Sequence, residues 1–143
     1  MTIWLGGPTL EALNQRSKNT LAEYLGIEFI ELGEDYLKAR MPVDARTVQP
    51  LRILNGGASC ALIETAASTA ANICVDQTKE YCIGLDINAN HLRSITEPSQ
   101  VIALIRPLHV GRKTQVWSAE LSNEKGQLTC VGRMTMMVMQ RNA

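Results

Sequence analysis

The chain has 143 residues, with 14 basic and 14 acidic side chains and a formal net charge of zero. This length suits a single domain, and we expect one domain over residues 1–143. Hydrophobic residues make up 45% of the chain and charged residues 20%, a composition that excludes extensive disorder. The balanced charge excludes a generally basic nucleic-acid-binding protein.

Two further classes of protein find no support in the sequence. The first residues carry no basic segment followed by an apolar one, so we expect no signal peptide. Residues 58–75 contain Glu64 and Asn72 and are too polar for a membrane span. The cysteines form no CxxC pair and have no His at ligand spacing, which predicts no metal site and a cytoplasmic protein with reduced thiols at Cys60, Cys74, Cys82 and Cys130.

Short helices are predicted at the start of the chain. Thr9 is placed to cap the first helix, and Asn19 to cap a second one that ends at Gly26. The hydrophobic pattern then alternates over residues 27–31 and 36–41, with turn residues between them. This alternation indicates a β-hairpin.

The rest of the chain predicts one long helix followed by strands. A proline- and glycine-containing loop at 42–57 leads into residues 58–75, whose small uncharged side chains favour a helix buried on most sides. Alternating segments then indicate strands at residues 81–93, 101–110, 114–121 and 127–139. We therefore expect an α+β fold in which an antiparallel sheet wraps around a long central helix.

Glu64 is the only charged residue in the predicted central helix. A buried carboxylate is costly unless it is paired or functional, and perturbed carboxylates are frequent in catalytic sites. Ser68 lies four residues further on and shares its helix face. The alternative is structural: Glu64 pairs with an Arg from a strand, or lies on an exposed stripe.

Asn55, Gly56 and Gly57 stand at the predicted helix start. Glycines there expose backbone N–H groups at the positive end of the helix dipole, which is the chemistry of an oxyanion site for acyl transfer. Gln49, in the preceding loop, could orient a water molecule. The alternatives are an ordinary helix-entry turn and a solvated glutamine.

Gly56 and Glu64 are too far apart on one helix to act on the same carbonyl group. Eight residues separate them, which corresponds to about 12 Å along the axis. If both act on one carbonyl carbon, they come from different chains. A two-fold dimer with antiparallel neighbouring helices would bring them together in two sites.

These residues resemble the hotdog-fold acyl-CoA thioesterases, in the branch that contains the 1,4-dihydroxy-2-naphthoyl-CoA thioesterases of menaquinone biosynthesis and the proofreading thioesterases of enterobactin synthesis. The similarity covers almost the whole chain. It is carried by Glu64, Ser68 and the stretches at 9–14, 41–44, 49–59, 84–91, 107–111 and 115–117.

The resemblance implies a homodimer or homotetramer that hydrolyses an aryl- or acyl-CoA thioester without metal or cofactor, coenzyme A being part of the substrate. Glu64 would be nucleophile or general base, and the Gly56 N–H would polarise the carbonyl group. Gln49 and Ser68 would help to place the water or the carboxylate. The implied substrate-binding residues are His91, Arg93, Gly84 and Gly57.

One position departs from the family pattern, which has His where this chain has Asn55. Asn can donate a hydrogen bond but cannot transfer a proton. The sequence leaves open natural variation with retained activity, an engineered substitution and a weakened enzyme. Two other functions also stay open: a non-catalytic acyl-CoA-binding protein, and a hotdog hydratase or dehydratase, against which the absence of His between Pro50 and Glu80 argues.

Overall fold

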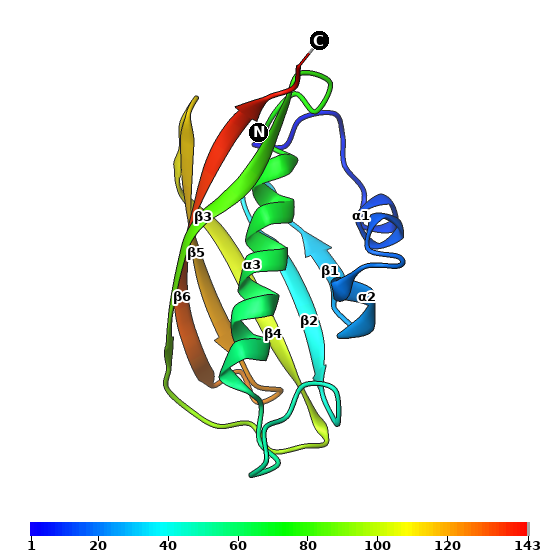
Figure 1. The fold of residues 1–143 in the computed structure, drawn as a ribbon, viewed down its shortest axis with the longest axis vertical. Coiled ribbons are helices and arrows are strands. Elements are labelled where there is room, and N and C mark those ends of the chain that lie inside the picture. Colours follow the sequence, from blue (N-terminus) through cyan, green and yellow to red (C-terminus); the bar gives the residue numbers. More distant parts are fainter. Residues whose placement is uncertain (143) are drawn as a thin grey trace.

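A computed structural model describes residues 1–142. Six antiparallel strands form one sheet in the order β1-β2-β4-β5-β6-β3, and the sheet curves behind the long helix α3 (Figure 1). This arrangement confirms the predicted α+β hotdog architecture. The strands are β1 (Glu28–Leu32), β2 (Leu37–Val43), β3 (Glu80–His91), β4 (Ser99–Val110), β5 (Thr114–Ser122) and β6 (Leu128–Gln140).

Two short helices, α1 (Leu10–Arg16) and α2 (Leu21–Tyr24), lie beside α3 (Figure 1). Thr9 caps α1 as predicted, because its hydroxyl accepts a hydrogen bond from the Ala12 N–H at 3.2 Å. The predicted cap of α2 is wrong by one residue, since Thr20 holds that position. Asn19 instead takes a left-handed conformation, with φ 61°, and its N–H donates to the Glu23 carboxylate at 2.6 Å.

Helix α3 (Gly56–Asn72) begins two residues before the predicted start and ends three residues before the predicted end. Its sheet-facing side is fully buried and rich in alanine, which allows the sheet to approach closely. The expectation of burial on most sides is correct only for this face. The rest of the helix is half-buried: Glu64 and Ser68 lie toward β3 and β6, and Thr65 and Thr69 lie toward the α1–α2 segment.

The core between α3 and the sheet is mainly aliphatic, with methionine as filler. Met134 and Met136 on β6 are both buried. The two tryptophans stack on each other, with the ring centroids of Trp4 and Trp117 6.1 Å apart. Within the described part of the chain, no helix has the length and apolar character needed to cross a membrane.

Candidate functional site

The candidate site is built along the line where α3 and β3 run antiparallel. Because the strand retraces the helix, residues that are far apart in the sequence meet in order along it. The end of α3 meets the start of β3 at Asn72 and Cys82. The middle of the helix meets β3 where Glu64 lies against Gly84, and its first residue lies under His91 at the end of the strand.

The Asn72 side chain ties the helix to the strand. Its amide oxygen accepts from the Cys82 N–H at 2.8 Å, and its amide nitrogen donates to the Cys82 carbonyl at 3.0 Å. The same nitrogen donates to the Ser68 carbonyl at 2.9 Å. An apolar residue here would leave backbone groups of both elements unpaired, at a cost of about 1–3 kcal/mol for each buried one. Asn72 therefore sets the position of β3 two residues before Gly84.

Glu64 occupies space that only a glycine in β3 can leave free. A Cβ atom on Gly84 would overlap the Glu64 carboxylate and the Met134 methyl group. The strand also bulges here, because Gly84 pairs with Met136 and Asp86 with Thr135, which leaves Leu85 as an extra residue. Bulges often direct side chains beside active sites. The lack of a side chain at Gly84 thus makes room for the carboxylate.

The environment of Glu64 disfavours its charge. Burial raises the pKa of the Glu64 carboxyl above its ordinary value. Among residues 1–142, no Lys, Arg or His forms an ion pair with it, so the structure contradicts the alternative of an Arg partner. A poorly hydrated carboxylate without a cation is a stronger base and nucleophile than a hydrated one. This is the chemistry expected of a catalytic group.

The start of α3 offers one backbone donor. The Asn55 side-chain oxygen caps the helix by accepting from the Gly57 N–H at 2.7 Å. The Gly57 N–H is therefore already paired and does not donate to a ligand. Within the described residues, no protein group accepts from the Gly56 N–H, which leaves it and the Asn55 NH₂ group available to a ligand. Of the oxyanion donors predicted at the helix start, the Gly56 N–H and the Asn55 NH₂ group are therefore the two that can still donate to a ligand.

A cavity of about 390 Å³ opens at this helix start. His91 covers Gly56, and its Nε2 atom lies 2.9 Å from the place that a Cβ on Gly56 would take. Arg93 lines the same cavity, and its other walls come from Ile53, Leu54, Ser59, Leu92, Ser94, Ile95 and Thr129. Three of the predicted residues, Gly56, His91 and Arg93, therefore meet around one opening whose walls combine apolar and hydroxyl side chains.

Gln49 and Ser68 are not bonded to Glu64. The Gln49 side-chain oxygen accepts from the Leu51 N–H at 2.6 Å, which fixes it within its own loop. The Ser68 hydroxyl points toward the Met136 sulfur at 3.9 Å, a weak partner. Neither contact tests the predicted roles in placing water. Both leave the groups free for a ligand, since the Gln49 NH₂ and the Ser68 hydroxyl lack a strong acceptor among residues 1–142.

The predicted residues therefore form two groups in one chain. One group lies at the helix start, with Asn55, Gly56 and His91, and the other lies two turns further on, with Glu64 and Gly84. Sequence reasoning missed Asn72 and Met134, which support and desolvate the second group. The available signal was that Asn72 is the only other strongly polar side chain on the helix face of Glu64 and Ser68.

Other catalytic chemistries find little support. Among residues 1–142, no cluster of three His, Cys, Asp or Glu side chains is arranged to hold a metal ion. The cysteines are free, and burial raises the pKa of Cys74 to about 12 and that of Cys82 to about 11. These two thiols stay protonated at neutral pH and are poor nucleophiles.

Replacing Glu64 with Gln should stabilise the fold in a pH-dependent way. Because the folded-state pKa of Glu64 is raised, the folded protein holds this proton more tightly, and stability falls as pH rises through the interval above the ordinary glutamate pKa. The glutamine of E64Q does not ionise, so this fall in stability with rising pH is absent from the variant. Its free energy of unfolding should exceed that of the wild type above this interval, and the gap should shrink below it, as measured by denaturant titration across pH.

The exposed strand residue Glu120 provides the matched control. Glu120→Gln should leave the pH dependence of stability as in the wild type. A gap between Glu64→Gln and wild type that stays constant with pH would contradict the desolvation of Glu64.

Comparison with known proteins matches residues 51–130 to the Thioesterase superfamily. The chain is 43% identical to the 1,4-dihydroxy-2-naphthoyl-CoA hydrolase of Escherichia coli, over 96% of this chain and 99% of that one. It is 44% identical to the proofreading thioesterase EntH of Cronobacter turicensis, over 96% of this chain and 98% of that one.

The fold agrees with these matches. The crystal structure of a mutant thioesterase from Pseudomonas aeruginosa superposes with a TM-score of 0.95 and 43% identity, and covers 98% of this chain and 100% of that one. Both the family match and the identities extend over most of the residues that build the two groups described above. The chain belongs to the thioesterase superfamily, whose hotdog fold it adopts, and is a thioester hydrolase.

Proposed function

We propose that this protein hydrolyses an aryl- or acyl-CoA thioester, with Glu64 as its nucleophile or general base. The observation that carries the proposal is the poorly hydrated Glu64 carboxylate, held against Gly84 without a cation partner. The free Gly56 N–H, contributed by a second copy of the chain, supplies the second requirement, a donor for the developing oxyanion.

The reaction can follow two routes. In one, Glu64 takes a proton from water while the water oxygen attacks the thioester carbon; the C–S bond of the tetrahedral intermediate then breaks, and the proton passes to the departing coenzyme A sulfur. In the other, the carboxylate itself attacks, coenzyme A leaves, and water hydrolyses the resulting anhydride. In both, the Gly56 N–H and the Asn55 amide donate to the oxyanion. Gln49 and Ser68 would help to orient the water.

The cavity at the helix start can take the pantetheine end of coenzyme A. Its walls combine apolar and hydroxyl side chains, and His91 lies where the pantetheine arm would meet the thioester. Arg93 is exposed at this cavity and can donate to a phosphate group of the coenzyme. Gly57 contributes through the tight helix entry, because its N–H holds the Asn55 cap in place.

We also propose that the active unit contains at least two copies of the chain. Strand β3 is an edge of the sheet, and Ile83 and Leu85 on it are 43% and 53% exposed. Pairing this edge with a second copy around a two-fold axis would cover both side chains and bring the helix start of one copy toward Glu64 of the other. Two such dimers can associate further into a tetramer.

The named relatives indicate the acyl group. An aromatic acyl-CoA such as 1,4-dihydroxy-2-naphthoyl-CoA is the leading candidate, which would place the enzyme in menaquinone biosynthesis in the cytoplasm. The second candidate function is acyl-CoA binding with little turnover. It is favoured by Asn55, which stands where the family pattern has His and uses its side-chain oxygen as a helix cap.

A panel of acyl-CoA thioesters with detection of the released thiol tests the activity. Glu64→Ala should lower kcat by about 10²–10⁴, the range expected for loss of a general base or of the nucleophile it serves. Gly84→Ala should also lower kcat strongly while the protein stays folded, because the new Cβ would displace the carboxylate. Glu120→Ala is the surface control. A loss below tenfold in Glu64→Ala would refute the assigned role.

Asn55→His should raise kcat and lower stability at the same time. The imidazole supplies a stronger donor for the oxyanion, but it cannot replace the amide oxygen that caps Gly57. We expect a gain of less than about 10²-fold in kcat and a loss of about 1 kcal/mol in the free energy of unfolding. In Asn55→Ala, both quantities should fall. An unchanged or lower kcat in Asn55→His would count against an oxyanion role for this position.

Mixed dimers test whether each site is shared between chains. Gly56→Pro removes the N–H at a position where proline suits a helix, and Glu64→Ala removes the carboxylate. Each variant alone should be inactive. Co-refolded in equal amounts, they should recover about a quarter of wild-type activity, because half of the dimers are hybrids with one intact site each. No recovery in dimers shown to be hybrid would place both groups of a site in one chain.

A further inference from the structure

Four polar side chains are buried within residues 1–142, and three of them have a clear partner in the protein. Thr47 and Thr129 donate to backbone carbonyl groups at 2.7 Å and 3.1 Å, and Gln115 accepts from an indole N–H at 3.0 Å. The fourth is Ser59 on α3, which is 3% exposed. Its hydroxyl forms no hydrogen bond with any other described residue.

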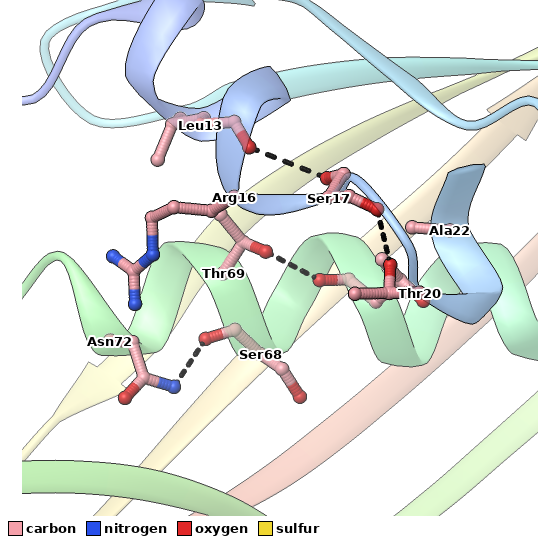
Figure 2. A pocket seen from close by; sticks show the side chains of 9 residues that line it. Leu13, Arg16, Ser17, Thr20, Ala22, Ser68, Thr69 and Asn72 are labelled. Carbon is pink, nitrogen blue, oxygen red and sulfur yellow. Dashed lines mark hydrogen bonds between the residues drawn. The ribbon is translucent and has the colours of Figure 1, made fainter.

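The usual acceptor for a serine in a helix is already occupied at this position. Serine and threonine hydroxyls in helices commonly donate to the carbonyl group three or four residues earlier. Thr69 does so on the same helix, where its hydroxyl donates to the Thr65 carbonyl at 2.9 Å (Figure 2). The matching acceptor for Ser59 is the Asn55 carbonyl, which already accepts from the Ala58 N–H at 3.0 Å and the Ser59 N–H at 3.2 Å. Both lone pairs of that carbonyl oxygen are therefore in use.

The Ser59 hydroxyl opens into the cavity at the helix start. Ser59 lines this cavity together with Gly56 and His91. Within residues 1–142, no completely enclosed side-chain nitrogen or oxygen atom lacks a hydrogen bond. Because the Ser59 hydroxyl lacks one, it must still be open to the cavity. A buried hydroxyl without a partner is costly, so this placement favours a ligand as the partner.

The packing of α3 does not need a hydroxyl at this position. An alanine would suit this face of the helix and is a better helix former than serine. The other buried side chains of α3 are all apolar: Leu62, Ile63, Ala66, Ala67, Ala70 and Ala71. The hydroxyl therefore has no structural role within the described chain, which points to a role in binding.

We infer that the Ser59 hydroxyl binds the first amide group of the pantetheine arm of the substrate. The inference rests on the proposed thioesterase function, because the Gly56 N–H defines where the thioester carbonyl lies. Ser59 is three residues beyond Gly56, about 4.5 Å along the helix, and the first amide is two methylene groups from the thioester sulfur. A hydroxyl can pair with either the N–H or the C=O of an amide. Ser59 is thus a binding residue that positions the thioester and takes no part in bond making.

The test compares two benzoyl thioesters that differ only in this amide. The N-acetylcysteamine thioester contains it, and the pentanethiol thioester has methylene groups in its place. The wild type should prefer the first in kcat/KM. Ser59→Ala should lower kcat/KM for the amide substrate by about fivefold to tenfold, as for one lost hydrogen bond, and change the other by less than about twofold.

A serine on β5 provides the control for activity. Ser118→Ala removes a hydroxyl that donates to the Arg106 carbonyl at 3.2 Å, and it should leave the preference between the two substrates intact. Equal losses on both substrates in Ser59→Ala, or no preference in the wild type, would overturn the inference.

Stability distinguishes binding from a structural role. Ser59→Ala should not lower the denaturant midpoint of unfolding, because no protein hydrogen bond is lost and alanine favours the helix. Thr47→Val is the contrasting variant and should lower the midpoint. It removes a buried hydroxyl that donates to the Pro42 carbonyl at 2.7 Å and accepts from the Asp44 N–H at 3.1 Å. A comparable fall in Ser59→Ala would show a structural role and overturn the inference.

Binding of coenzyme A separates this inference from the proposed function. Coenzyme A is titrated calorimetrically against the wild type, Ser59→Ala and Ser118→Ala. The Kd should rise by about fivefold to tenfold in Ser59→Ala only. If the wild type hydrolyses neither thioester, the proposed activity fails, yet this rise in Kd still supports the role of Ser59. An unchanged Kd in Ser59→Ala, or no binding to the wild type, overturns that role even where hydrolysis is observed.

Discussion

The double hydrogen bond between the Asn72 side chain and the backbone of Cys82 determines how the site is arranged. It joins the last turn of α3 to the first residues of β3 and starts the strand back along the helix. The positions of the later β3 residues relative to α3 depend on that alignment. Gly84 reaches the level of Glu64, and His91 reaches the level of Gly56, only because the strand begins in this register.

The same alignment separates the chemistry into two halves. The donor at Gly56 and the carboxylate at Glu64 belong to one rigid helix, so no loop movement within a chain can bring them to one carbonyl carbon. In a monomer, this fixed separation would keep the two groups from acting on one carbonyl carbon. In a symmetric assembly, the two groups of one site can come from different chains. Each half is held to its own chain by packing, and in the proposed dimer association would bring the two halves to the productive distance.

The sequence predicted the elements well because their signals are local. The alternation in the strands and the uncharged run around Glu64 depend on neighbouring residues, and so did the donor site at Gly56. The predicted cap at Asn19 was wrong because Asn19 takes a left-handed conformation, with φ 61°, and the extended residue before α2 is Thr20. The contacts of Asn72 with Cys82 and of Gly84 with Glu64 join separate elements. No pattern along the chain shows which glycine a carboxylate will face. These two contacts could therefore be found only in the structure.

The charges of the site explain how a neutral chain can serve an anionic substrate. In the proposed function, coenzyme A is recognised at the helix start, where a backbone donor, the helix dipole and Arg93 supply positive potential. Glu64 must stay without a cation to remain reactive, because a nearby Arg or Lys would lower its pKa and its basicity. In the proposed function, positive charge thus lies beside the coenzyme and is withheld from the Glu64 carboxylate.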